Sequence, residues 1–122
     1  MTKAPKSTSR QKAQKYGLFA ETLAAFALRI KGYKIVERNF KTKLGEIDII
    51  ARKGDLVAIV EVKARKSLQA SIDGVGYQST QRIENAADLW LAKQKDAHLI
   101  SMRFDIIAVQ PRKWPVHIKD AF

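Results

Sequence analysis

Two short runs of alternating apolar and charged residues, separated by one tight turn signal, most constrain how this chain can fold. Residues 46–51 (EIDIIA) and 56–63 (LVAIVEVK) set isoleucine or valine on the face opposite their charged neighbours, which is the period of a β-strand. The segment between them, 52–55 (RKGD), is a short glycine-containing connection of the kind that closes a hairpin. The sequence therefore predicts a pair of antiparallel strands joined by a tight turn.

Periodic apolar residues on either side of this hairpin predict two helices. From Tyr16 onward one apolar helical face recurs at spacings of four, three and four, formed by Phe19, Leu23, Phe26 and Ile30, and Gly32 ends the helix. A second helix is expected over residues 79–93, capped by Ser79, with one face made of Ile83, Ala86, Ala87, Trp90 and Leu91. Further strands are expected over residues 33–40 and 98–109, with a short edge piece over 114–118, whereas residues 64–78 are expected to form a loop. The order α-β-β-β-α-β predicts an α/β fold with a mixed central sheet flanked by helices.

Length and composition bound the class of protein. A chain of 122 residues with 46% hydrophobic and 29% charged residues suits one globular domain, expected over residues 16–122. Residues 1–15 are basic and polar, so we expect a flexible arm rather than a secretory signal. No cysteine is present, and no apolar run approaches the roughly 20 residues of a membrane helix. These features predict a cytoplasmic protein with no membrane partner.

The excess of positive charge is concentrated in one part of the chain. The net charge is +11, and residues 1–45 hold eleven Lys or Arg against two acids, a net of +9. A polyanion such as nucleic acid is the partner that this charge favours. The alternative is a solubilising tail on an ordinary domain.

The turn decides whether the charged residues of the two strands meet. If residues 54–55 form a two-residue type II′ turn, Asp48 faces Glu61. In the same register Glu46 faces Lys63. A turn centred one residue earlier keeps these four residues on one face, whereas a three-residue turn sends Glu61 and Lys63 to the other face. Two of the three registers therefore assemble three carboxylates and an ammonium.

Such a cluster has two interpretations. Carboxylates a few ångströms apart repel one another unless a cation or a proton lies between them. Their oxygens suit Mg²⁺ or Mn²⁺, which can activate water and stabilise charge on a phosphate, with Lys63 assisting. The alternative is the solvated polar face of an antiparallel strand pair.

The sequence also resembles a known family. Asp48, followed after twelve residues by Glu61-Val62-Lys63, is similar to the D…E-x-K signature of restriction-endonuclease-like nucleases. The surrounding motifs are more specific and occur in the order Ala20-Glu21, Gly32-Tyr33, Arg38-Asn39, Gly45-Glu46-Ile47-Asp48-Ile49-Ile50, Val60-Glu61-Val62-Lys63-Ala64-Arg65 and Arg103-Phe104-Asp105. Together they resemble the uncharacterised bacterial YraN-like family, which is related to Holliday-junction resolvases. The resemblance covers about residues 16–110.

The resemblance implies a restriction-endonuclease-like fold with a metal-dependent phosphodiesterase centre. Asp48 and Glu61 would then ligate the metal together with the carbonyl of Val62, and Lys63 would orient water or stabilise the transition state. Glu21 would enter the same centre from the first helix. The residues themselves support this placement, since Glu21 lies on a helix that is apolar nearly all round, where a carboxylate needs a cation, a donor or a gap in the packing. The alternative for Glu21 is a helix edge open to solvent.

Other charged residues extend the expected site. Arg65 and Lys66 directly follow the E-x-K signature and are expected to contact a phosphate backbone. Arg38 and Arg103 are candidates for the same role, or for structural partners of Glu37 and Asp105. Glu46 is expected to act either as a ligand or through a neighbouring ligand.

Together with these residues, the resemblance implies a Mg²⁺- or Mn²⁺-dependent endonuclease acting on DNA, including branched or structured DNA. The alternative is a nucleic-acid-binding module without catalysis, and a third interpretation is a structural protein with a basic tail. Because resolvases need two active sites to cut a junction symmetrically, the analogy suggests a homodimer.

Overall fold

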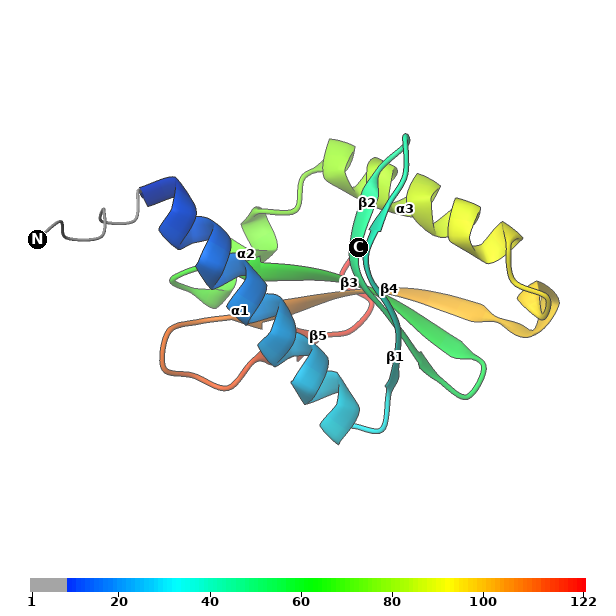
Figure 1. The fold of residues 1–122 in the computed structure, drawn as a ribbon, viewed down its shortest axis with the longest axis horizontal. Coiled ribbons are helices and arrows are strands. Elements are labelled where there is room, and N and C mark those ends of the chain that lie inside the picture. Colours follow the sequence, from blue (N-terminus) through cyan, green and yellow to red (C-terminus); the bar gives the residue numbers. More distant parts are fainter. Residues whose placement is uncertain (1–8) are drawn as a thin grey trace, which may run out of the picture.

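One five-stranded sheet carries the fold. The computed structural model describes residues 9–122, with the element order α1 (Ser9–Ile30), β1 (Lys34–Lys41), β2 (Glu46–Lys53), β3 (Leu56–Ala64), α2 (Leu68–Asp73), α3 (Tyr77–Ala92), a short 3-10 helix (Ala97–Leu99), β4 (Ser101–Val109) and β5 (Val116–Ile118). The strands lie in the order β1-β2-β3-β4-β5. All neighbouring strands are antiparallel except β3 and β4, which are parallel. The predicted α/β fold, a mixed sheet flanked by helices, is confirmed (Figure 1).

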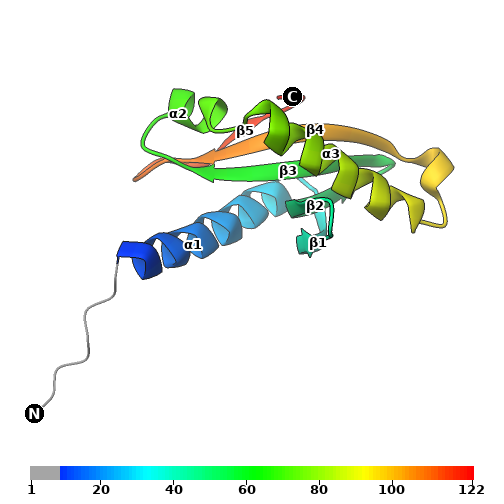
Figure 2. The ribbon, with the colours of Figure 1, turned by 90° about the horizontal axis from the view of Figure 1, so that it is seen from above.

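The helices form two layers, one on each face of the sheet. Figure 2 shows α1 beneath β3 and α2 above it, with α3 crossing in front of the strands. The α1 face buries mostly small residues of the helix against strand residues that include Ile49, Val60 and Ile107. The α3 face buries Ile83, Ala86, Ala87 and Trp90 of that helix, as the second apolar stripe predicted. Two apolar cores therefore sandwich the sheet.

The first helix differs from its prediction at its start and in its buried face. It begins at Ser9 rather than Tyr16, so residues 9–15 of the predicted arm are helical, and residues 1–8 lie outside the described residues. Its buried side carries Ala20, Glu21, Ala24, Ala25, Ala27 and Leu28. The face identified from periodicity is largely exposed instead, with Phe19 at 58%, Phe26 at 52% and Ile30 at 62%. Small alanine side chains allow the helix to lie close to the sheet, which leaves the larger apolar residues on the outside.

The central hairpin has the register of the two-residue turn. Ile49 pairs with Val60 and Lys53 with Leu56, so residues 54–55 form the turn. Gly54 has φ +63°, the left-handed conformation that glycine adopts at the first position of a type II′ turn. The register is therefore that of the predicted two-residue turn, but the pairing ends at Ile49 and Val60 and does not continue to Asp48 and Glu61.

The segment after β3 is more ordered than predicted. The expected loop over 64–78 contains the helix α2, whose first turn is capped by the hydroxyl of Ser67 accepting a hydrogen bond from the N–H of Ala70. The next helix, α3, begins at Tyr77 with Gly76 as its N-cap, so the predicted cap at Ser79 is wrong. Ser79 instead lies in the first turn. Within residues 9–122, none of the helices is both long and apolar enough to cross a membrane.

Candidate active site

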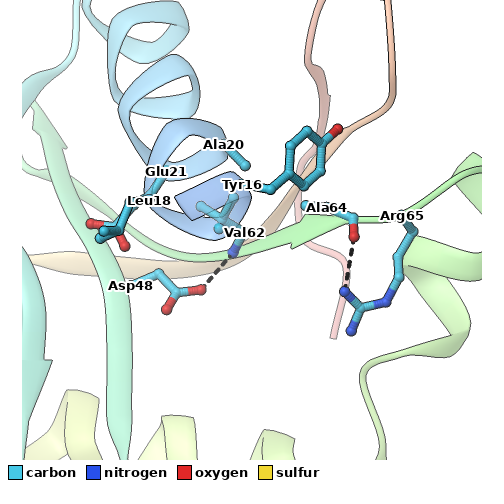
Figure 3. A pocket seen from close by; sticks show the side chains of 9 residues that line it. Tyr16, Leu18, Ala20, Glu21, Asp48, Val62, Ala64 and Arg65 are labelled. Atoms are coloured by element: carbon cyan, nitrogen blue, oxygen red, sulfur yellow. Dashed lines mark hydrogen bonds between the residues drawn. The ribbon is translucent and has the colours of Figure 1, made fainter. Parts of the chain in front are cut away.

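The pairing of β2 with β3 ends at Ile49 and Val60, and the carboxylate of Asp48 lies directly beyond the last pair. The next residue of β2 is Asp48, whose Oδ2 accepts a hydrogen bond from the backbone N–H of Val62 at 2.8 Å. Figure 3 shows this bond at the wall of a pocket that also contains Glu21. The side chain of Asp48 therefore replaces a backbone partner at the place where the two strands separate.

The surroundings of Asp48 disfavour its ionised form. Burial raises its pKa to about 7, and the negative charges of Glu61 and Glu21 act in the same direction. The hydrogen bond from Val62 lowers the pKa but does not compensate for the other effects. No Lys or Arg side chain forms an ion pair with Asp48 in the described part of the chain. A cation at this position would therefore stabilise the carboxylate.

Glu61 and Lys63 lie together on β3, as the alternation of the strand predicts. Lys63 Nζ is 3.1 Å from Glu61 Oε1, and both side chains are largely buried, at 15% and 16% exposure. The aliphatic part of Lys63 also approaches Gly74, at the end of α2. The ammonium is consequently held within reach of the acidic pair rather than in open solvent.

Glu21 reaches the same pocket, but its charge already has partners. It is 6% exposed, which excludes the solvent-open helix edge considered as an alternative. Arg38 Nε and Asn39 Nδ2 both donate to Glu21 Oε1, each at 3.0 Å. A second guanidinium nitrogen of Arg38 donates to Thr22 Oγ1 at 3.1 Å. Arg38 is thus a structural partner of Glu21 rather than of Glu37.

The acidic residues line two cavities, which lie on opposite faces of the sheet. Beneath α1, a cavity of about 590 Å³ is lined by Tyr16, Gly17, Leu18, Ala20, Glu21, Asp48, Val62, Ala64 and Arg65. Beneath α3, a smaller cavity of about 220 Å³ is lined by Glu46, Glu61, Ser79, Arg82 and Ile83. Asp48 connects the two cavities. It lines the larger one, and the charge of Glu61, which lines the smaller one, acts on it.

Arg82 lines the smaller cavity, and the sequence patterns did not indicate it as a site residue. It lies three residues after Ser79 and therefore on the same side of α3. Its backbone carbonyl also lies so close to Gly45 that a Cβ at position 45 would sit 2.3 Å from it. The spacing of Ser79, Arg82 and Ile83 on one helix face is the signal that could have identified it.

The predicted basic residues are distributed unevenly around the site. Arg65 lines the larger cavity, with one guanidinium nitrogen donating to the carbonyl of Ala64 at 3.0 Å, and Lys66 beside it is exposed. Arg103 lies on β4 opposite Ala58, three residues along β3 from Glu61. It lines neither cavity.

Arg103 has the structural role that was the alternative to phosphate binding. It forms an ion pair with the fully buried Asp105 at 2.7 Å and donates to the hydroxyl of Tyr33 at 2.8 Å. Burial alone would raise the pKa of Asp105, but hydrogen bonds from His117, Arg103 and the backbone N–H of Asp120 outweigh it and lower the pKa to about 2. This network fixes β4 to β5 and to the segment after α1.

The donor set around Asp48 fits a divalent cation held partly by water. Within residues 9–122, no three His, Cys, Asp or Glu side chains lie close enough to hold a metal by themselves. Magnesium, however, is commonly bound through one or two carboxylates, with water and substrate oxygens completing the shell. Asp48 and Glu61 satisfy that requirement, because burial and the negative charge of Glu61 raise the pKa of Asp48, and a cation between the two carboxylates would relieve their repulsion.

The fold and site define a mixed α/β protein whose central hairpin carries two interacting carboxylates, Asp48 and Glu61, and a lysine paired with one of them. The chain belongs to the uncharacterised protein family UPF0102, whose model matches residues 20–109, so the YraN-like family indicated by the motifs is confirmed. A family member from Mesorhizobium japonicum is 55% identical over 95% of this chain and 93% of its own length. One from Bartonella tribocorum is 53% identical over all of this chain and 94% of its own length. One from Brucella canis is 58% identical over 87% of this chain and 84% of its own length.

Proposed function

We propose that this protein is a nuclease that uses Mg²⁺ or Mn²⁺ to hydrolyse phosphodiester bonds in DNA, including branched or otherwise structured DNA. The observation that carries the proposal is the position of Asp48, which lines a cavity and accepts a hydrogen bond from the N–H of Val62, while burial and then the negative charge of Glu61 raise its pKa to about 7. A purely structural ion-pair network would lower the pKa of its carboxylates, as happens at Asp105. A strongly perturbed carboxylate beside an open cavity is typical of functional sites.

Each residue of the site has a distinct part in this reaction. Asp48 and Glu61 would hold the divalent ion, with the carbonyl of Val62 as a further oxygen donor and Glu46 near Glu61. When bound, such an ion lowers the pKa of water and stabilises the negative charge that builds on the phosphate. The ammonium of Lys63, paired with Glu61 at 3.1 Å, would donate to the same developing charge.

The reaction itself is a hydrolysis. The oxygen of water forms a bond to phosphorus, and the bond from phosphorus to one sugar oxygen breaks. The leaving oxygen takes up a proton, so that one product ends in a phosphate and the other in a hydroxyl. Glu21, held by Arg38 and Asn39, contributes a fixed negative charge at the edge of the same cavity.

A DNA substrate is supported by the charge of the chain. The net charge is +11, and Arg65 and Lys66 extend from the site along the continuation of β3. Basic residues of this kind contact phosphates without reading sequence. A cytoplasmic location and a homodimer belong to the same proposal, because a symmetric cut in a four-way junction needs two active sites.

A cleavage screen tests the proposal. Native protein and Asp48→Asn are incubated with linear duplex, single-stranded, flapped and four-way DNA, with Mg²⁺, with Mn²⁺ or with EDTA. We expect native protein to cut at least one substrate only with metal, and Asp48→Asn to bind DNA without cutting it. If native protein binds DNA in a salt-sensitive way and cuts nothing with either metal, the non-catalytic binding module replaces the nuclease.

A further inference from the structure

The outer face of α1 exposes aromatic residues that pack against one another instead of against the core. The rings of Tyr16 and Phe19 are 6.4 Å apart, and Phe26 meets Trp114 edge-on at 6.2 Å. Phe19, Phe26 and Trp114 each remain more than half exposed. Exposed aromatic clusters of this kind mark interaction sites on soluble proteins.

A groove lies between this face and the loop that follows β4. It has a volume of about 300 Å³ and is lined by Tyr16, Phe19, Leu23, Val109, Gln110, Pro111, Arg112, Lys113 and Trp114. Tyr16 also lines the larger cavity of the candidate active site, so the two hollows share a wall. The N–H of Arg65, which lines the larger cavity, donates to the carbonyl of Val109, which lines the groove, at 3.2 Å.

The loop presents two cations at the rim of the groove through a strained backbone. The N–H of Lys113 donates to the carbonyl of Gln110, which closes a turn with Pro111 in its second position. Arg112, in the third position, has φ +60°, a left-handed conformation that usually falls to glycine. Arginine at this position therefore carries a backbone strain that glycine would not.

Gln110 adds a polar amide to a groove whose other lining residues are aromatic, aliphatic or cationic. It is 8% exposed and lines the groove. An amide donates and accepts at once, which is the pattern that the edge of a nucleobase presents.

We propose that this groove holds an unpaired base of the DNA strand whose neighbouring phosphodiester lies at the Asp48–Glu61 site, so that the preferred substrate has a single-stranded segment beside the cut. This inference rests on the proposed function. The aromatic rings supply stacking surfaces, while Arg112 and Lys113 supply phosphate contacts. In a duplex the flat faces of the bases are covered by their neighbours, and only an unpaired base can stack on these rings.

A second copy of the chain fits the same face less well. Arg112 and Lys113 are exposed and line the groove, and a twofold contact centred on it would bring these like charges together. A polyanionic strand would neutralise them. The charge therefore favours nucleic acid over self-association.

The test measures binding in EDTA, where no cleavage interferes, by fluorescence anisotropy of a labelled single strand and of a blunt duplex. Trp114→Leu should weaken single-strand binding about tenfold, within the range for loss of one stacked base, and should change duplex binding less than twofold. Trp114→Phe, which keeps a ring, should retain most of the affinity.

A second pair of variants separates the charge from the turn. Arg112→Gly should weaken single-strand binding several-fold without lowering the Tm, because glycine adopts the positive φ at no steric cost. Lys95→Gly, which removes one exposed charge in the turn after α3, should leave single-strand binding nearly unchanged.

Each remaining outcome overturns one proposal or the other. Equal losses for single strand and duplex, or no loss with Trp114→Leu, refute the groove. Sedimentation that shows Trp114→Leu converting a dimer to a monomer, with DNA binding unchanged, assigns the face to a second copy and refutes it as well. If the groove variants behave as expected while native protein cuts no substrate with metal, the groove stands and the proposed nuclease fails. If native protein cuts DNA with metal but shows no preference for single-stranded segments, the proposed nuclease stands and the groove fails.

Discussion

The backbone N–H of Val62 donates to Oδ2 of Asp48 at 2.8 Å, at the point where the paired part of β2 and β3 ends. This contact joins the middle residue of the E-x-K segment to the acidic residue of the neighbouring strand. It fixes the Asp48 carboxylate toward β3 while burial and the charge of Glu61 oppose its ionisation. The site therefore holds a carboxylate in position before any cation is present.

Binding of a divalent ion should stabilise the native protein through this pair. At a tenfold excess of Mn²⁺ over its Kd, we expect the Tm to rise by about 5 °C, because the ion binds only the folded state. The double variant Asp48→Asn, Glu61→Gln should show no comparable rise. Differential scanning fluorimetry with and without Mn²⁺ measures both, and equal shifts would locate the ion elsewhere.

The raised pKa of Asp48 predicts a pH dependence of stability in the absence of metal. The folded pKa is about 7 and the ordinary value is 3.8, so the folded state binds the proton more tightly than the unfolded state. The resulting stability is complete below pH 4 and is lost as the pH rises through 7. Relative to Asp48→Asn, native protein in EDTA should therefore lose on the order of 2–4 kcal/mol between pH 4 and pH 8.

Urea unfolding of the two proteins across that range provides the measurement. Titrating groups that do not interact with Asp48 cancel in the difference between native protein and the variant, so the difference reports on Asp48 together with the carboxylates that act on it. A difference that stays constant from pH 4 to pH 8 would show that Asp48 is ionised normally.

The buried network around Asp105 should have the opposite dependence on pH. Its pKa is lowered to about 2, so the stability it contributes is present above pH 4 and is lost as the pH falls through 2. Asp105→Asn should lower the free energy of unfolding by about 3–5 kcal/mol at pH 7, because it leaves Arg103 without its counter-charge. The gap between native protein and the variant, followed by urea unfolding, should narrow below pH 4. A gap of the same size at pH 7 and at pH 2.5 would contradict the ionised pair.

The residues of the central hairpin were the most predictable part of the fold. Alternation in β2 and β3 and the glycine at position 54 limit the register to few choices, and the observed pairing of Ile49 with Val60 is one of them. The apolar stripe of α3 was predictable for the same reason, since Ile83, Ala86 and Trp90 share one helical face and are buried. Local periodicity is reliable where one face is apolar and the other is polar.

The first helix shows where periodicity fails. Because α1 is apolar nearly all round, the sequence does not reveal whether the alanines or the aromatic residues face the sheet. The partners of Glu21 were equally hidden, because Arg38 and Asn39 lie 17 and 18 residues away in sequence and meet it only through tertiary packing. The helix α2 was missed because six residues without a clear apolar period resemble a loop.

The most direct measurement of the central claim is the single-turnover rate of DNA cleavage by Lys63→Met, compared with native protein and with Lys66→Met. Both variants remove one positive charge from the same segment, but only Lys63 is paired with Glu61 beside Asp48. If the Asp48–Glu61–Lys63 group is the reacting centre, Lys63→Met should cut on the order of 10²-fold more slowly at saturating protein, with little loss of DNA affinity. Lys66→Met should cut at nearly the native rate once DNA is saturated. Cleavage by Lys63→Met at the native rate would contradict the assignment of this group as the catalytic centre.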